Sequence, residues 1–286
     1  MRAVIKVDRT NCCIFNNSLN REISELNGVY GVNIDNYKNE VIVDYTDEVN
    51  IDEIYSKLQE NGYSVIPGQL FGNTDYASEQ DYFKSKAGDW DSPMKVEMAK
   101  KFVAEMLKNV NLDNEKKVLD YGCGTGLIGM EVAPLVKSVV FLDNSAAMVN
   151  ILENKLGKAF EKHEYSSENI KVIMGDINKY TTKDIDVVFS LMALHHVEDV
   201  QAAFEHISAN ILKPGGLLVI GDLKEENGSF HGEEKVPHNG FNIPNLAQQL
   251  EFSEMEVITT TTYNTILKNG NEYEQFIIVA KKQQTN

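Results

Sequence analysis

Cysteine and basic residues are scarce in this sequence, and long apolar runs are missing. Three cysteines occur in 286 residues, and two of them are adjacent, so they cannot form a disulfide framework. No stretch approaches the roughly 18 apolar residues of a membrane helix, so we expect no membrane association. Lys6 and Asp8 interrupt the apolar run that a signal peptide needs. We therefore expect a soluble cytoplasmic protein with reduced thiols.

The shortage of basic residues limits the expected partners. The 27 Lys and Arg residues are outnumbered by 43 Asp and Glu residues, which gives a net charge of -16. Nucleic-acid binding depends on neutralising phosphates, so this charge argues against DNA and RNA as main partners, although a small basic patch is compatible with it. The length predicts one large domain or two ordinary ones. The composition does not specify an oligomeric state.

The first 66 residues predict a small domain with the order βαββαβ. Strands are expected at 3–7, 30–34, 40–45 and 63–66, with helices at 16–26 and 51–59. This order is the α+β ferredoxin-like arrangement, in which two helices cover one face of a small sheet. Residues 67–78 have the turn-rich composition of a linker.

Residues 79–286 predict a larger α/β domain. Helices are expected at 79–87 and 93–109. Short apolar strands are expected at 117–121, 139–142, 171–174, 185–189 and 217–220, mostly with helical segments between them. This alternation is typical of a parallel sheet covered on both faces. The segments 255–263 and 274–280 are joined by Lys268-Asn-Gly-Asn271, a hairpin signal. We therefore expect a mostly parallel sheet of seven strands with a C-terminal antiparallel hairpin.

A glycine-rich loop follows the first strand of this larger domain. Gly122, Gly124 and Gly126 lie where the strand turns into a helix, and glycines allow the backbone to approach a ligand closely. The loop departs from a nicotinamide-dinucleotide site, because Leu127 stands where the third glycine is needed and Asp120 precedes the loop.

Acidic residues follow the next two strands. Asp143 comes after the second strand and Asp176 after the third. Because carboxyl ends of neighbouring parallel strands meet at one edge of the sheet, we expect Asp120, Asp143 and Asp176 to surround one crevice. Each Asp alone is equally explained as a helix N-cap or a solvated turn residue. The three together with the glycines favour a ligand site.

These motifs resemble those of class I S-adenosylmethionine-dependent methyltransferases, which have a Rossmann-like fold. The resemblance covers about residues 75–283 and rests on Asp120-Tyr-Gly-Cys-Gly-Thr-Gly126, Asp143-Asn-Ser-Ala-Ala-Met148, Gly175-Asp-Ile177 and Leu212-Lys-Pro-Gly-Gly216. It implies S-adenosylmethionine as the cofactor. It also implies that Asp120 and the three glycines hold the methionine part.

The same resemblance assigns the remaining cofactor contacts. Asp143 would bind the ribose, and Asn144 and Met148 would pack near the adenine. Asp176 and the backbone amide of Ile177 would read the adenine edge. Ser190, at the end of the fourth strand, would present its carbonyl to the ammonium group of the cofactor.

His195 and His196 are the candidates for a catalytic base, because they follow the fourth strand on the substrate side of the expected crevice. A structural role in capping or bonding the loop is the alternative. A metal pair is disfavoured, because no carboxylate or Cys stands at matching spacing. Trp90 belongs to an aromatic segment, Tyr82 to Pro93, that resembles one folding over the cofactor in related enzymes; packing on the core is the alternative. The loop 230–241 has an open role.

Cys12 and Cys13 are the candidates for a metal site in the small domain. The domain resembles the heavy-metal-associated family, in which the loop after the first strand carries Cys-x-x-Cys. Here Cys12 stands at the first ligand position, but Phe15 stands at the second. Soft thiolates still favour ions such as Cu(I) or zinc. The alternative is a degenerate domain that serves assembly or substrate recognition.

The sequence therefore predicts a methyltransferase that uses S-adenosylmethionine on a small molecule by in-line displacement. The domains are 1–66, the linker 67–78 and the methyltransferase domain 79–286. The alternative is a metal- or metalloid-responsive binding protein whose methyltransferase-like domain holds the cofactor without catalysis.

Overall fold

The computed structural model describes residues 2–9, 22–24, 26–35, 40–46, 49, 51–60, 63–65, 90–162, 165–232 and 234–283. The chain divides into two compact units, Met1–Glu79 and Gln80–Asn286. In these ranges no helix has both the length and the apolar character needed to cross a bilayer.

The first unit contains a four-stranded antiparallel sheet in the order β2-β3-β1-β4. Its elements are β1 (Arg2–Arg9), β2 (Val29–Asp35), β3 (Glu40–Tyr45), α2 (Ile51–Glu60) and β4 (Tyr63–Val65). Alternate residues Val41 and Val43 of β3 are buried together with Ile54 and Leu58 of α2, as one-sided burial of a sheet requires. The first predicted helix is described only at residues 22–24, so the complete ferredoxin-like arrangement stays a prediction.

The second unit contains a seven-stranded sheet in the order β10-β11-β9-β8-β5-β6-β7. The strands are β5 (Lys117–Tyr121), β6 (Ser138–Asp143), β7 (Ile170–Met174), β8 (Ile185–Leu191), β9 (Leu212–Leu223), β10 (Met255–Lys268) and β11 (Asn271–Lys282). Strands β5 to β9 pair in parallel, whereas β11 pairs antiparallel with both β9 and β10. The Rossmann-like, mostly parallel sheet with a C-terminal hairpin is confirmed.

The last strands are longer than the sequence patterns predicted. Strand β9 includes the Lys213-Pro-Gly-Gly216 segment, which forms an irregularity in the pairing with β8 rather than a separate turn. The hairpin turn contains only Asn269 and Gly270, which have φ angles of 54° and 81°. Two consecutive positive φ angles define the tight turn that Asn-Gly favours, so regular pairing continues almost to the tip.

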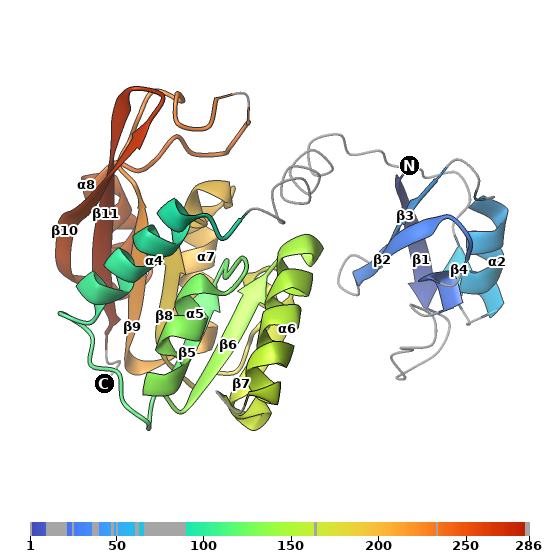
Figure 1. The fold of residues 1–286 in the computed structure, drawn as a ribbon, viewed down its shortest axis with the longest axis horizontal. Helices are drawn as coiled ribbons and strands as arrows, with labels where there is room; N and C mark the ends of the chain where they lie inside the picture. Colours follow the sequence, from blue (N-terminus) through green and yellow to red (C-terminus); the bar gives the residue numbers. More distant parts are fainter. Residues whose placement is uncertain are drawn as a thin grey trace. The chain divides into compact units, whose positions relative to one another are not determined.

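Helices cover both faces of this sheet (Figure 1). On the face toward the viewer lie α4 (Pro93–Met106), α5 (Leu127–Val132) and α6 (Ala146–Glu161), and on the other lie α7 (Val200–His206) and α8 (Ile243–Phe252). Phe102 of α4 and Leu152 of α6 belong to one buried cluster, and Phe204 of α7 and Leu250 of α8 belong to the other. The parallel strands are therefore buried on both sides, and their ends are the places where ligands can reach them.

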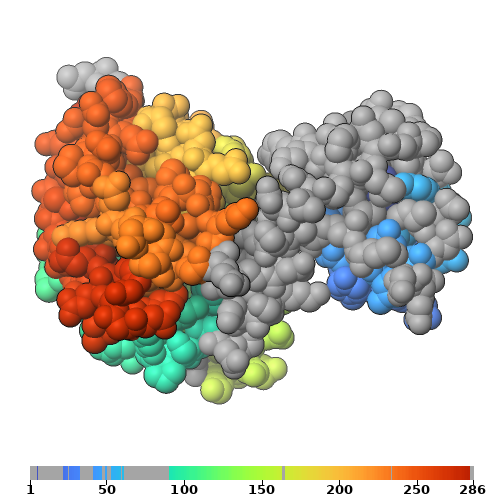
Figure 2. Space-filling view, turned by 90° about the horizontal axis from the view of Figure 1, so that it is seen from above, coloured from blue at the N-terminus to red at the C-terminus, as the bar shows by residue number. Residues whose placement is uncertain are grey.

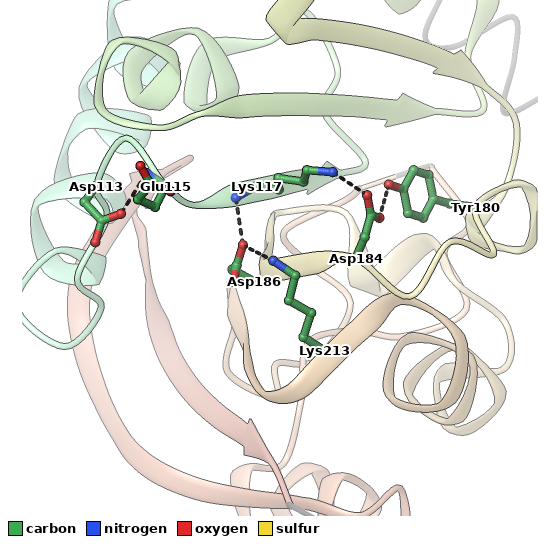
Figure 3. Close-up of polar contacts among 7 residues, drawn as sticks. All are labelled: Asp113, Glu115, Lys117, Tyr180, Asp184, Asp186 and Lys213. Carbon is green, nitrogen blue, oxygen red and sulfur yellow. Dashed lines mark hydrogen bonds and ion pairs between the residues drawn. The ribbon is translucent and has the colours of Figure 1, made fainter.

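The amino ends of the strands are joined by a network of charges (Figure 3). Asp186 accepts hydrogen bonds from the backbone N–H of Lys117 at 2.9 Å and from Nζ of Lys213 at 2.8 Å. Asp184 accepts from Nζ of Lys117 at 2.8 Å and from the hydroxyl of Tyr180 at 2.7 Å. Burial acts to raise the pKa of Asp184, but the bonds from Lys117 and Tyr180 outweigh it, and the pKa is lowered. This network ties together the beginnings of β5, β8 and β9.

Candidate active site

The glycine loop between β5 and α5 requires its glycines for steric reasons. Gly122, Gly124 and Gly126 have φ angles of 68°, 52° and 82°, a region that side chains with a Cβ rarely adopt. A Cβ added to Gly122 would lie 2.3 Å from Cβ of Ala193, and one added to Gly126 would lie 2.4 Å from Cδ1 of Leu152. The loop is therefore packed directly against Ala193, which follows β8, and Leu152 of α6.

Asp143, at the end of β6, anchors this loop. Its Oδ2 accepts a hydrogen bond from the N–H of Gly124 at 2.7 Å, and its Oδ1 accepts from the N–H of Ser145 at 2.8 Å. The carboxylate is 8% exposed. Each carboxylate oxygen can accept a second hydrogen bond, so Asp143 can both hold the loop and accept bonds from a ligand.

Asp120 and Ser190 place polar atoms in the interior without protein partners. Asp120 Oδ2 accepts from the N–H of Gly129 at 2.9 Å, but Asp120 Oδ1 and Ser190 Oγ are buried and have no hydrogen-bond partner among the described residues. The two residues come from the adjacent strands β5 and β8. Burial, followed by the negative charge of Asp143, raises the pKa of Asp120 to about 8 against the opposing Gly129 bond. Buried polar atoms of this kind normally have a partner, which a bound ligand would supply.

The remaining residues predicted to contact the cofactor lie at the same edge of the sheet. Asp176 follows β7 and is exposed; its Oδ1 accepts from the N–H of Asn178 at 2.9 Å. Ile177 and Met148 are buried, whereas Asn144 is exposed. Burial and the charges of Asp176 and Asp143 raise the pKa of the neighbouring Tyr121. Asp120, Asp143 and Asp176 therefore lie close together at the carboxyl ends of β5, β6 and β7, where Asp143 affects the pKa of Asp120 and both Asp143 and Asp176 affect that of Tyr121.

Trp90 also lies beside the glycine loop. A Cβ on Gly124 would lie 3.5 Å from Nε1 of Trp90. The next residue, Asp91, accepts hydrogen bonds from the hydroxyl of Thr125 at 2.5 Å and from Nζ of Lys155 at 2.8 Å. These contacts join the start of α4 to the loop. Residues 81–89, which include most of the predicted aromatic segment, lie outside the described residues.

His195 is buried and forms a pair with an aspartate that the sequence analysis did not identify. It belongs to the 3₁₀ turn η5 (Leu194–His196) after β8 and is 2% exposed. Its Nδ1 lies 2.7 Å from Oδ1 of Asp222, a fully buried residue near the end of β9. The backbone N–H of His195 donates to Asp222 Oδ2 at 3.3 Å. The sequence signal that could have identified Asp222 is its position as the one acid within the apolar segment Leu217 to Leu223.

A third histidine, His231, lies beside His195 and His196 and comes from the loop after β9. The ring centroid of His231 lies 4.7 Å from that of His195, and the His196 ring lies 4.3 Å from His195. The loop is held to the hairpin, because Ser229 Oγ lies 2.9 Å from the Tyr273 hydroxyl and Nζ of Lys268 donates to the Phe230 carbonyl at 2.5 Å. Figure 2 shows the orange segment after β9 beside the red hairpin.

Cys12 and Cys13 lie outside the described residues. Cys123 is buried in the core, and burial, together with the charges of Asp143 and Asp120, raises its pKa. A reactive thiolate at Cys123 is thus disfavoured. Within the described part of the chain, no group of three or more His, Cys, Asp or Glu residues is arranged to hold a metal ion.

Comparisons with known proteins show that this chain is similar to methyltransferases. Residues 119–220 match the family model described as a methyltransferase domain. An uncharacterized methyltransferase of Schizosaccharomyces pombe is 31% identical over 170 residues, covering 53% of this chain and 60% of that protein. A putative methyltransferase of Invertebrate iridescent virus 6 is 33% identical over 125 residues, covering 42% of this chain and 43% of that protein.

The fold is shared with solved structures. An S-adenosylmethionine-dependent methyltransferase from Aquifex aeolicus has a TM-score of 0.54 at 20% identity, covering 70% of this chain and 98% of that one. Residues 119–220 therefore match a methyltransferase domain, and the second unit has the fold of the Aquifex aeolicus protein. The solved neighbours from Aquifex aeolicus and Listeria monocytogenes, at 20% and 18% identity, are described as an S-adenosylmethionine-dependent methyltransferase and a putative one.

Proposed function

We propose that this chain transfers the methyl group of S-adenosylmethionine to a small-molecule acceptor by in-line displacement. The observation that carries the proposal is the pair of buried polar atoms without described partners, Asp120 Oδ1 and Ser190 Oγ, beside a loop whose glycines exclude side chains. The ligand that fits carries cationic and polar groups, as the methionine part of S-adenosylmethionine does. The net charge of -16 supports a small acceptor over a nucleic acid.

The chain would bind and orient the reactants. When bound, S-adenosylmethionine supplies a methyl group on a positively charged sulfur. Asp120, Ser190 and the glycine loop would hold its methionine part, and Asp143 would accept from its ribose. Asp176, Ile177, Asn144 and Met148 would contact its adenine. Because the leaving group is already activated, the contribution of the protein is proximity, orientation and exclusion of water.

Calorimetry with S-adenosylhomocysteine tests this proposal. We expect the full chain to bind it in the micromolar range or tighter, which corresponds to about 8 kcal/mol. Asp143→Asn should weaken binding by roughly 1–3 kcal/mol, because hydrogen bonds to the loop and the ribose are lost. Asp184→Asn, at the opposite edge of the sheet, is the matched control and should keep wild-type affinity. Absence of binding by the wild type, or preference for a nicotinamide dinucleotide, would overturn the proposal.

A further inference from the structure

The imidazole of His195 is held in one orientation by a buried carboxylate. His195 Nδ1 lies 2.7 Å from Asp222 Oδ1. A carboxylate at this contact accepts from Nδ1–H and so favours the tautomer whose Nε2 is an acceptor. Asp222 also accepts from the backbone N–H groups of His195 and Leu223. The aspartate therefore fixes both the ring and the turn that carries it. A base oriented by a third group is the usual arrangement for proton abstraction.

This pair lies next to the expected cofactor site. Ala193, two residues before His195, is the residue that a Cβ on Gly122 would meet at 2.3 Å. Ser190 is the next-to-last residue of β8, the strand that leads to this turn, and its neighbour Phe189 pairs in register with Asp120 of β5. The base and the glycine loop therefore share one edge of the sheet, at adjacent strand ends.

Two further polar atoms near the pair have no partner among the described residues. His231 Nε2 and the Tyr263 hydroxyl are both buried without a hydrogen bond there. The His231 ring contacts that of His195. Burial, followed by the charge of Asp222, raises the pKa of Tyr263. No described residue hydrogen-bonds to His195 Nε2 either. Such atoms beside an oriented base call for a polar ligand that can satisfy them.

We propose that His195 is the general base of the transfer, that Asp222 is its positioning residue, and that the acceptor is a hydroxyl compound. This inference rests on the proposed function. A hydroxyl is the acceptor that needs such a base, because a phenolic hydroxyl ionises near pH 10. An amine already carries a free lone pair when neutral, and a thiol ionises closer to neutrality.

The step balances in atoms and charge. The acceptor O–H bond breaks, and its proton goes to His195 Nε2. The acceptor oxygen forms a bond to the methyl carbon as the bond between that carbon and the sulfur breaks, and its electron pair stays on sulfur. The positive charge thus moves from sulfur to the imidazole, where the Asp222 carboxylate stabilises it.

The test measures methyl transfer by the full chain from tritium-labelled S-adenosylmethionine to matched acceptors. The hydroxyl set is catechol, 4-hydroxybenzoate and propanol, and the comparison set is benzylamine and benzenethiol. We expect transfer to a hydroxyl compound. On the acid side of the optimum, log kcat should fall by one for each pH unit. The titratable groups around His195 among the described residues are Asp222, His196, His231 and His238, with Glu234 beside His231 and Tyr263 near Asp222. His195→Gln and Asp222→Asn should each lower kcat about 100-fold or more with little change in KM.

His206→Gln is the matched control, because His206 lies on α7 and contacts the Tyr180 carbonyl away from the site. It should keep the wild-type rate. Nitrogen-15 NMR supplies a readout that is independent of turnover. With S-adenosylhomocysteine bound, the Nε2 signal of His195 should be of the unprotonated type and should shift when the hydroxyl acceptor is added. The His206 signals should not shift.

The outcomes separate this inference from the proposed function. If S-adenosylhomocysteine binds but methyl goes only to the amine or the thiol, or to no hydroxyl compound, the inference is overturned and the cofactor assignment stands. A His195→Gln enzyme that keeps its kcat and acid-side slope also overturns it. Failure of S-adenosylhomocysteine to bind the wild type refutes the proposed function instead.

Discussion

Removing the charge of Asp120 should stabilise the ligand-free protein at neutral and alkaline pH. Burial raises the pKa of Asp120 to about 8 in the folded chain, against an ordinary value of 3.8. The unfolded chain therefore loses this proton at lower pH than the folded chain does. The stability of the wild type falls as pH rises through the window between these values, and the full cost is present above about pH 8. Asp120→Asn has no such proton to lose.

The expected size follows from the width of that window. At 1.36 kcal/mol per pH unit, the stability of Asp120→Asn relative to the wild type should rise by about 4 kcal/mol between pH 5 and pH 8. Urea unfolding of both proteins at pH 5, 6, 7 and 8 measures this difference. Glu153→Gln, which removes an exposed carboxylate on α6, controls for the loss of one negative charge. A difference between Asp120→Asn and the wild type that does not change with pH would refute the reasoning.

The same substitution should weaken cofactor binding. A cationic ligand beside Asp120 favours the ionised carboxylate, so binding near pH 7 should release a proton from the wild type. Calorimetry of S-adenosylhomocysteine in buffers of different ionisation enthalpy measures that proton, and Asp120→Asn should not release it. The ionised Asp120 would then lower the stability of the ligand-free protein and stabilise the bound ligand.

Three other outcomes are expected. Gly122→Ala should lower the free energy of unfolding by about 1–3 kcal/mol and lower S-adenosylhomocysteine affinity, because Gly122 has a φ of 68° and a new Cβ would meet Ala193. Gly157→Ala is the control: its new Cβ meets open space, so the free energy of unfolding measured in urea should rise by about 0.5–1 kcal/mol. The bonds from Lys117 that lower the pKa of Asp184 stabilise the fold above the unfolded-state value of about 3.9. That contribution should be lost as pH falls through the folded-state value, so acid unfolding of Asp184→Asn should lack this step. Limited proteolysis should cut first within 67–78 and leave a fragment near 80–286 that binds S-adenosylhomocysteine; unfolding of that fragment would contradict the domain boundary.

The glycine loop and the positions of Asp120, Asp143 and Asp176 at one edge of the sheet were predictable from the sequence because their signals are local. The three glycines follow a strand and open a helix, and this order alone requires a tight turn with positive φ angles. Asp143 and Asp176 each end an apolar segment, and the geometry of parallel sheets brings such positions to one edge. The same local patterns predicted the seven strands and the hairpin. They underestimated the length of β9, whose start contains the irregular Lys213-Pro-Gly-Gly216 segment, and of β10, which continues to the hairpin turn.

The arrangement around His195 depended on the tertiary structure. Asp222 lies 27 residues from His195 along the chain, and the two meet because β9 pairs beside β8. The His231 ring reaches them only because its loop is held to the hairpin by Ser229 and Lys268. Contacts of this kind are set by strand order and packing, which no spacing in the sequence encodes. The sequence by itself therefore predicted the cofactor, through its resemblance to a family, and the tertiary structure brought Asp222 and His231 to His195.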